Sequence, residues 1–148
     1  MTVIKFVDFE PKHLANINLQ SAQQPIIDSY TSEQMEACCK TLQQHPTLTI
    51  IDGEVVLAII SMVQVSENRG LVSTFISVEA APRMYAVTKM TKLALSRFKY
   101  LRIEAITETN FIPGNRWLKL LGFQLEGTMR KYDHFGNDYN LYSLISGE

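Results

Sequence analysis

The sequence is poor in cysteine, glycine and proline, and it has no long apolar run. Its two cysteines, Cys38 and Cys39, are neighbours, where a disulfide bond would distort the backbone, so a reducing compartment and a cytoplasmic protein are expected. The seven glycines and five prolines are scattered without a linker or repeat, which predicts a single domain over residues 1–148. The longest apolar run, Val55–Ile60, is far shorter than the roughly 20 residues of a membrane-spanning helix, so no membrane partner is expected.

An excess of charge of one sign is also missing. Lys and Arg number 14, Asp and Glu number 15, and the net charge is −1. Nucleic-acid binding depends on many cationic side chains, so we expect no nucleic-acid partner. The histidines, at positions 13, 45 and 134, have no Cys or carboxylate at ligand spacing, so no metal site is expected. Hydrophobic residues make up 46% of the chain, enough to form a core.

Alternating and helical patterns of apolar residues divide the first third of the chain. Pro11 suits the first turn of a helix, and Asp52-Gly53 is a hairpin signal. The expected elements are a strand over Thr2–Phe9, a helix from Pro11, a polar connection over Ser21–Ser29, a helix from Thr31 or Ser32 to His45, and strands over Leu48–Ile51 and Val55–Val65.

The remainder changes between the two periods. From about Arg83, apolar residues recur at helical spacing, and Gly122 is placed to end a later helix. The expected elements are a strand over Leu71–Val78, a helix from Arg83, a strand over Leu101–Ile106, a short helix after Pro113, and a hairpin of Phe123–Tyr132 with Tyr139–Ile145.

The resulting element order is β-α-α-β-β-β-α-β-α-β-β. Leu71–Val78 and Leu101–Ile106 are joined by a crossover helix, so these two strands are expected to be parallel. The other strands read as antiparallel. The predicted class is therefore α/β with a mixed sheet.

One stretch resembles a known family. Residues Asn115–Gly127 (NRWLKLLGFQLEG) end a helix at Gly122-Phe123 and continue to Glu126-Gly127. This is similar to the helix–strand stretch of the GCN5-related N-acetyltransferase (GNAT) superfamily, whose element order the chain shares. The resemblance implies the GNAT acyl-CoA N-acyltransferase fold. It also implies an acetyl-CoA-dependent N-acetyltransferase acting on a primary amine of a small molecule or a protein.

The resemblance implies that acetyl-CoA binds where two parallel strands splay apart, here Leu71–Val78 and Leu101–Ile106. Buried backbone groups without a neighbouring strand need partners, and the amides of the pantetheine arm would supply them. A backbone N–H within Ile76–Val78 would be the oxyanion donor. The coenzyme contacts implied around these strands are Ile76, Ser77, Val78, Asn110, Asn115 and Trp117. Alternatively, Asn110 or Asn115 caps the short helix, and Trp117 lies in the core.

The phosphate loop departs from the family pattern. Members carry Gln or Arg, two residues, Gly, one residue, then Gly or Ala at a helix start that binds pyrophosphate. Here Arg83 fits, but Ala86 stands where glycine is usual and Thr88 where a second small residue is usual. Glycine reaches positive φ and lets phosphate approach the backbone. The stretch is interpreted as a pyrophosphate site or as a plain helix start with an exposed arginine, and its residues are Arg83, Met84, Tyr85, Ala86, Val87 and Thr88.

Two side chains are candidates for catalysis. Glu79, at the exit of the first splayed strand, would deprotonate the amine directly or through water; alternatively it is a solvated carboxylate. Tyr132 would line the acceptor cleft; alternatively it packs in its strand with its hydroxyl in solvent. Leu118 stands where the family often has a tyrosine that protonates the thiolate, and water can take that part.

The same departures support a rival hypothesis, a GNAT-fold protein without catalysis that serves in binding or assembly. Trp117–Gly136 resembles small GNAT-like proteins carried by bacteriophages, some of which have a degraded cofactor loop. Edge strands near the last hairpin can pair between subunits, so a homodimer is one expected form.

Overall fold

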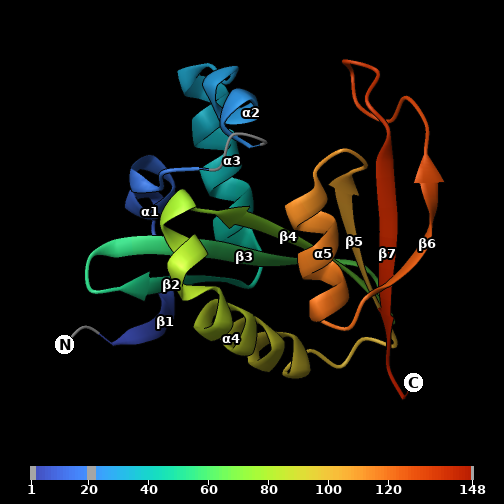
Figure 1. The fold of residues 1–148 in the computed structure, drawn as a ribbon. Coiled ribbons are helices and arrows are strands. Elements are labelled where there is room, and N and C mark those ends of the chain that lie inside the picture. The colour runs from blue at the N-terminus through green and yellow to red at the C-terminus, as the bar shows by residue number, and fades with distance from the viewer. Residues whose placement is uncertain (1–2, 20–22, 148) are drawn as a thin grey trace. The chain divides into compact units, whose positions relative to one another are not determined.

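The computed structural model describes residues 3–19 and 23–147, and Figure 1 labels their elements. Thr2 and Ser21, which bound two of the expected segments, lie outside the described residues. In chain order the elements are β1 (Ile4–Asp8), α1 (Pro11–Asn16), α2 (Gln24–Asp28), α3 (Ser32–Gln44), β2 (Thr47–Asp52), β3 (Val55–Ser66), β4 (Arg69–Ile76), the 3-10 helix η1 (Val78–Arg83), α4 (Met84–Ser96), β5 (Arg102–Glu108), α5 (Ile112–Leu120), β6 (Gln124–Met129) and β7 (Tyr139–Ile145).

The described strands form a seven-stranded mixed sheet in the order β1-β2-β3-β4-β5-β7-β6. β4 and β5 pair in parallel through Arg69–Leu71 and Arg102–Glu104, whereas β1 with β2, β2 with β3, β5 with β7, and β6 with β7 are antiparallel. The predicted α/β class with a mixed sheet is confirmed, as is the parallel pair.

Two segments differ from the expectation. The polar connection contains α2, whose first turn includes Pro25 and whose Gln24 amide bonds the Asp28 carboxylate at 2.7 Å, one helical turn on. The helix expected from Arg83 begins at Met84 and follows η1, which starts when the Ser77 hydroxyl accepts a hydrogen bond from the Glu79 N–H. These helices have five and six residues, too few for a periodic pattern of apolar residues to mark them in the sequence.

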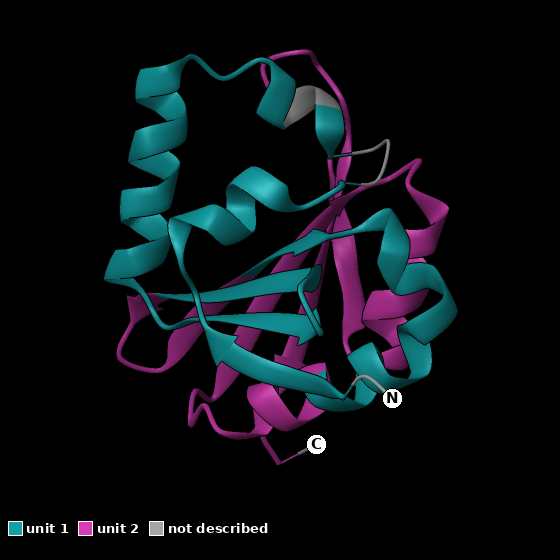
Figure 2. Ribbon diagram, turned by 90° about the vertical axis from the view of Figure 1, so that its left-hand side faces the viewer, with its two compact units in different colours: residues 1–63, 73–90 teal, residues 64–72, 91–148 magenta. Residues whose placement is uncertain are grey.

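The chain folds into two compact units, coloured separately in Figure 2. Unit 1 comprises residues 1–63 and 73–90, and unit 2 comprises residues 64–72 and 91–148. The single domain expected over residues 1–148 stays a prediction.

The core of unit 1 joins the first helices to the sheet. Apolar side chains from α1, α3 and β3 are buried together, and residues such as Phe9, Met35 and Phe75 pack against them. Cys38 and Cys39, on α3, also pack there, and burial raises the pKa of both thiols. The buried set is Leu14, Ile17, Leu19, Leu42, Val56 and Ile59.

A histidine is part of this interior. The His13 ring is buried, and its Nδ1 accepts a hydrogen bond from the Glu10 N–H at 3.0 Å and lies 2.9 Å from the Thr49 hydroxyl. Burial lowers the pKa of His13, and the nearby Glu10 carboxylate only partly opposes this effect. The folded chain therefore favours the neutral ring.

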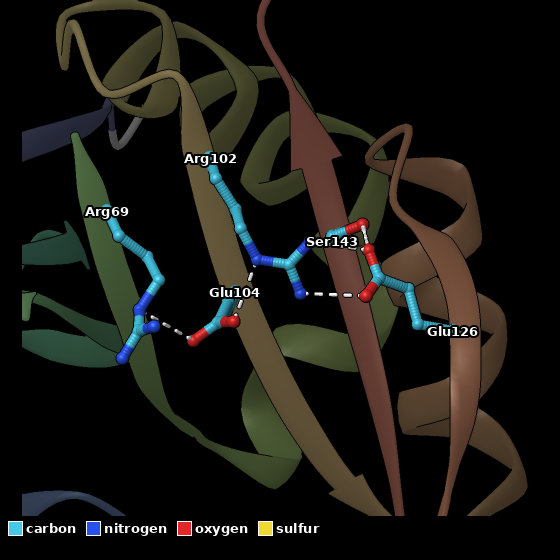
Figure 3. A network of polar contacts seen from close by, with 5 residues as sticks. All are labelled: Arg69, Arg102, Glu104, Glu126 and Ser143. Carbon is cyan, nitrogen blue, oxygen red and sulfur yellow. Dashed lines mark hydrogen bonds and ion pairs between the residues drawn. The ribbon is translucent and has the colours of Figure 1, made fainter.

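Unit 2 is braced by a chain of charged side chains (Figure 3). The Arg102 guanidinium on β5 donates two hydrogen bonds, of 2.6 and 2.8 Å, to the Glu126 carboxylate on β6. Its Nε donates to Glu104 at 2.8 Å, and Glu104 also pairs with Arg69 on β4 at 3.5 Å. The Ser143 hydroxyl on β7 donates to Glu126, and these bonds hold the pKa of Glu126 at about 2. The network links four strands of the unit.

We expect stability to fall as the pH falls, in part through His13. Because its pKa is lowered on folding, its contribution is fully present above the unfolded value of 6.5 and is lost as the pH falls through the folded pKa. Urea unfolding between about pH 8 and pH 5.5 checks this against His13→Gln, which keeps an acceptor but cannot titrate. A variant whose unfolding free energy falls as steeply as that of the wild type would contradict it.

A second prediction concerns the Arg102–Glu126 pair. In Arg102→Gln, the pKa of Glu126 should rise from about 2 toward the ordinary glutamate value, because its main hydrogen-bond donor is removed. Carbon-detected NMR of the Glu126 carboxylate during an acid titration measures this. Arg69→Gln is the matched control, since Arg69 contacts Glu104 and should leave the Glu126 titration unchanged.

Candidate active site

The parallel pairing of β4 with β5 does not extend along the second half of β4. Among the described residues that pairing ends at Leu71 and Glu104, which agrees with the limited pairing that the resemblance implies. The Ser77 N–H donates to the Leu57 carbonyl of β3 at 2.9 Å. Because successive residues of a strand alternate, Ile76 and its alternate neighbours direct their backbone groups to the opposite edge.

The backbone groups on that opposite edge form hydrogen bonds with other residues of unit 1. The Ile76 N–H donates to Gln23 Oε1 at 2.9 Å, and Gln23 Nε2 donates to the Thr74 carbonyl at 2.7 Å. The Val78 N–H donates to the Asn18 carbonyl at 2.8 Å. The edge assigned by resemblance to the coenzyme arm is thus occupied by two internal partners.

The chemistry of this edge fits a pantetheine arm. It offers an N–H at Ile76 and a C=O at Thr74, and the group bonded to both is already a carboxamide, that of Gln23. A pantetheine amide has the same acceptor and donor. Ile76 is buried, so its N–H requires a partner in any state of the protein.

The strand exit is held by polar contacts within unit 1. Ser77 is fully buried and caps η1 through its hydroxyl. The Arg83 Nε donates to the buried Asp52 carboxylate, at the end of β2, at 2.5 Å, and Arg83 Nη1 donates to the Glu79 carbonyl at 3.3 Å. Arg83 is therefore ion-paired with Asp52, while its side chain keeps 38% of its surface exposed.

The stretch over residues 83–88 is helical, as expected of a helix start. From Met84 onward the chain is α4, and no residue from 84 to 88 takes a positive φ, all of them being described. Ala86 and Thr88 thus adopt ordinary helical backbone, so glycine is not needed there for conformation. Val87 is fully buried, whereas Tyr85 is 80% exposed with the Lys89 ammonium 5.3 Å from its ring centroid.

Glu79 lies in the first turn of η1 and is exposed. Within the described part of the chain its carboxylate forms no hydrogen bond or ion pair, while its backbone bonds Ser77 and Arg83. The position of Glu79 is compatible with both the base and the solvated carboxylate.

The remaining candidates belong to unit 2 and are described apart from the Ile76–Thr88 group. Asn110 is exposed, and Trp117 is buried in α5. Tyr132 is 52% exposed, with its ring centroid 5.3 Å from that of Tyr139. Within unit 1 the structure brings together Ile76, Ser77, Val78, Glu79 and Arg83.

Asn115 is committed to the fold of unit 2. It is buried, and both ends of its amide bond the chain itself. Its Oδ1 accepts from the Tyr142 hydroxyl at 2.7 Å and from the Asn140 amide at 2.8 Å, and its Nδ2 lies 2.8 to 3.3 Å from the carbonyl oxygens of Glu108, Thr109 and Phe111. This geometry assigns Asn115 to the connection between β5 and α5 rather than to a ligand.

Sequence reasoning missed three residues of the site: Asn18, Gln23 and Asp52. Gln23 stands 53 residues from Ile76 in an unremarkable polar stretch, and Asp52 was read only as part of a turn. No spacing or composition marked any of the three.

Other kinds of site find no support in the described chain. Across residues 3–19 and 23–147, no three His, Cys, Asp or Glu side chains are grouped so that they could hold a metal ion. The described helices include none with the length and apolarity needed to cross a membrane.

At the level of sequence, no protein-family model and no curated protein matches the chain. Solved structures do match, over nearly its whole length. A GNAT-family acetyltransferase from Bacillus anthracis has a TM-score of 0.75 at 15% identity, with 100% of both chains covered. The protein yncA from Salmonella typhimurium, solved with its cofactor acetyl-CoA, has a TM-score of 0.71 at 12% identity, covering 98% of this chain and 95% of its own.

A third match is the ribosomal-protein-S5-alanine acetyltransferase from Vibrio fischeri. Its TM-score is 0.71 at 16% identity, covering 100% of this chain and 98% of its own. At these identities the likeness concerns the fold.

We expect Asn115→Ala to destabilise the protein by about 2–4 kcal/mol, because it leaves several buried partners without hydrogen bonds. Urea unfolding measures the change. Asn110→Ala is the matched control, since this exposed asparagine should shift stability by less than about 0.5 kcal/mol. Equal effects of the two substitutions would contradict the role given to Asn115.

Proposed function

We propose that this chain, which has the fold of the GNAT acetyltransferases, is an acetyl-CoA-dependent N-acetyltransferase that acetylates a primary amine. The observation that carries the proposal is the edge of β4. The Thr74 carbonyl and the Ile76 N–H of β4, and the Val78 N–H that follows at the start of η1, bond Gln23 and Asn18, which belong to no strand of the sheet. A pantetheine arm offers matching groups.

In this proposal the backbone at the end of β4 orients the coenzyme arm and polarises its thioester carbonyl. Bound acetyl-CoA supplies a thioester carbonyl for the amine to attack and a thiolate as leaving group. A backbone N–H within Ile76–Val78 would serve as the oxyanion donor to the thioester carbonyl. The other backbone groups of this edge, the Thr74 carbonyl among them, would hold the arm in register.

Glu79 is proposed to remove the proton from the amine, directly or through a water molecule. Its carboxylate is exposed, and its backbone is anchored by Ser77 and Arg83, so it follows the oxyanion donor at a fixed place in the chain. Tyr132 stays a proposal for the acceptor side.

The start of α4 is proposed to receive the pyrophosphate. The positive end of a helix dipole favours phosphate, and Thr88 adds a hydroxyl in its second turn. The Arg83 guanidinium is bonded to Asp52, so its proposed part is to hold η1 against the end of β2.

A second function is supported by two observations. The amide-binding groups of β4 already have partners in the chain, and Leu118, where the family often has tyrosine, is a buried apolar residue. Both suit a non-catalytic GNAT-fold protein, of the kind carried by bacteriophages, with a role in binding or assembly.

Titration calorimetry with acetyl-CoA, together with a thiol-release assay over a panel of primary amines, tests the proposal. We expect binding and amine-dependent release of CoA, with kcat lowered about 10²-fold or more in Glu79→Gln. Glu67→Gln, in the exposed turn after β3, should behave as the wild type.

Absence of binding at millimolar acetyl-CoA would refute the enzyme. Binding with no turnover of any amine would favour the non-catalytic alternative. If turnover is unchanged in Glu79→Gln, the proposed acetyltransferase activity is retained, but Glu79 is not its general base.

A further inference from the structure

Gln23 has an unusual pair of partners for a side chain. It lies immediately before α2, and its backbone carbonyl accepts from the Ile27 N–H at 3.5 Å. Its side chain reaches residues 51 and 53 positions away, Thr74 and Ile76. The backbone carbonyl of Gln23 thus accepts a hydrogen bond from α2, while its side-chain amide bonds the backbone of β4.

The two contacts imitate a neighbouring strand. Oε1 accepts from the Ile76 N–H at 2.9 Å and Nε2 donates to the Thr74 carbonyl at 2.7 Å, so one carboxamide satisfies two groups of the same strand edge. Next along the edge, Leu19 forms an antiparallel bridge with Ser77, and the Asn18 carbonyl accepts from the Val78 N–H.

This bonding has a physical cause. Ile76 and Ser77 are buried, and a buried N–H without a partner is costly, so the free protein needs a partner at this edge. Gln23 provides it. A ligand that bonds the same atoms must first break the two Gln23 hydrogen bonds, and its apparent affinity falls by what those bonds contribute.

We infer that Gln23 is an internal competitor of the coenzyme, a positioning residue whose carboxamide occupies the Ile76 N–H and the Thr74 carbonyl until acetyl-CoA replaces it. The inference rests on the proposed function. A rotation of the Gln23 side chain is sufficient to free the two groups, because the backbone bond to Ile27 is separate. The identity of residue 23 then sets how tightly acetyl-CoA binds.

The test compares the wild type with Gln23→Ala. Calorimetry with acetyl-CoA should show about tenfold tighter binding by the variant, because two hydrogen bonds no longer have to be broken. Amide hydrogen exchange by NMR should show that the Ile76 amide exchanges faster in the free variant than in the free wild type. Acetyl-CoA should then slow this exchange in both proteins.

Gln24→Ala is the matched control. Gln24 is the adjacent glutamine, its amide bonds Asp28, and its replacement should leave both readouts unchanged. Gln23→Glu is the second variant in case Gln23→Ala does not fold. A carboxylate still accepts from Ile76 but cannot donate to Thr74, so binding should again be tighter than in the wild type.

A merely structural Gln23 would give the opposite sign, with weaker coenzyme binding in the variants. Equal or weaker binding by both variants, or unchanged Ile76 exchange in the free proteins, overturns the inference while the proposed function stands. If neither the wild type nor the variants bind acetyl-CoA, the proposed function fails and the inference fails with it.

Discussion

A buried strand edge must have hydrogen-bond partners, and in this protein that requirement falls on the second half of β4. One edge is served by β3, through bonds such as that from the Ser77 N–H to the Leu57 carbonyl. The other edge carries the Ile76 N–H, which a strand, a ligand or another part of the chain must satisfy. The candidate site exists because, among the described strands, none pairs with this part of β4.

The position of η1, the segment after β4, is fixed by contacts at both of its ends. The Ser77 hydroxyl starts η1, and Arg83 ends it by reaching the buried Asp52 carboxylate. Together these contacts hold Glu79 and the start of α4 directly after the end of β4. Ala86 and Thr88, which differ from the family pattern, are accommodated because this stretch is helical and neither residue has to adopt a positive φ.

In unit 2, polar side chains do much of the positioning. Arg102 and Glu126 link β5 to β6 across β7 (Figure 3). The Asn115 amide bonds the carbonyl groups between β5 and α5. Such networks stabilise only when every member is satisfied, which makes each of them sensitive to a single substitution. The resemblance drew attention to Asn115 and Glu126 through their place in a family pattern, and the structure gives both a bracing role.

The kind and order of the main elements follow from local patterns in the sequence. Period-two and helical patterns are local properties, so Tyr139–Ile145, the Thr31 cap and the positive φ of Gly122 could be anticipated. The hydrogen-bond partners depend on the fold: Gln23 with Ile76, Asp52 with Arg83, and Asn115 with Tyr142. Hydrogen bonds between residues far apart in the chain depend on which segments the fold brings together. Such a contact produces no periodic pattern in the sequence around either residue.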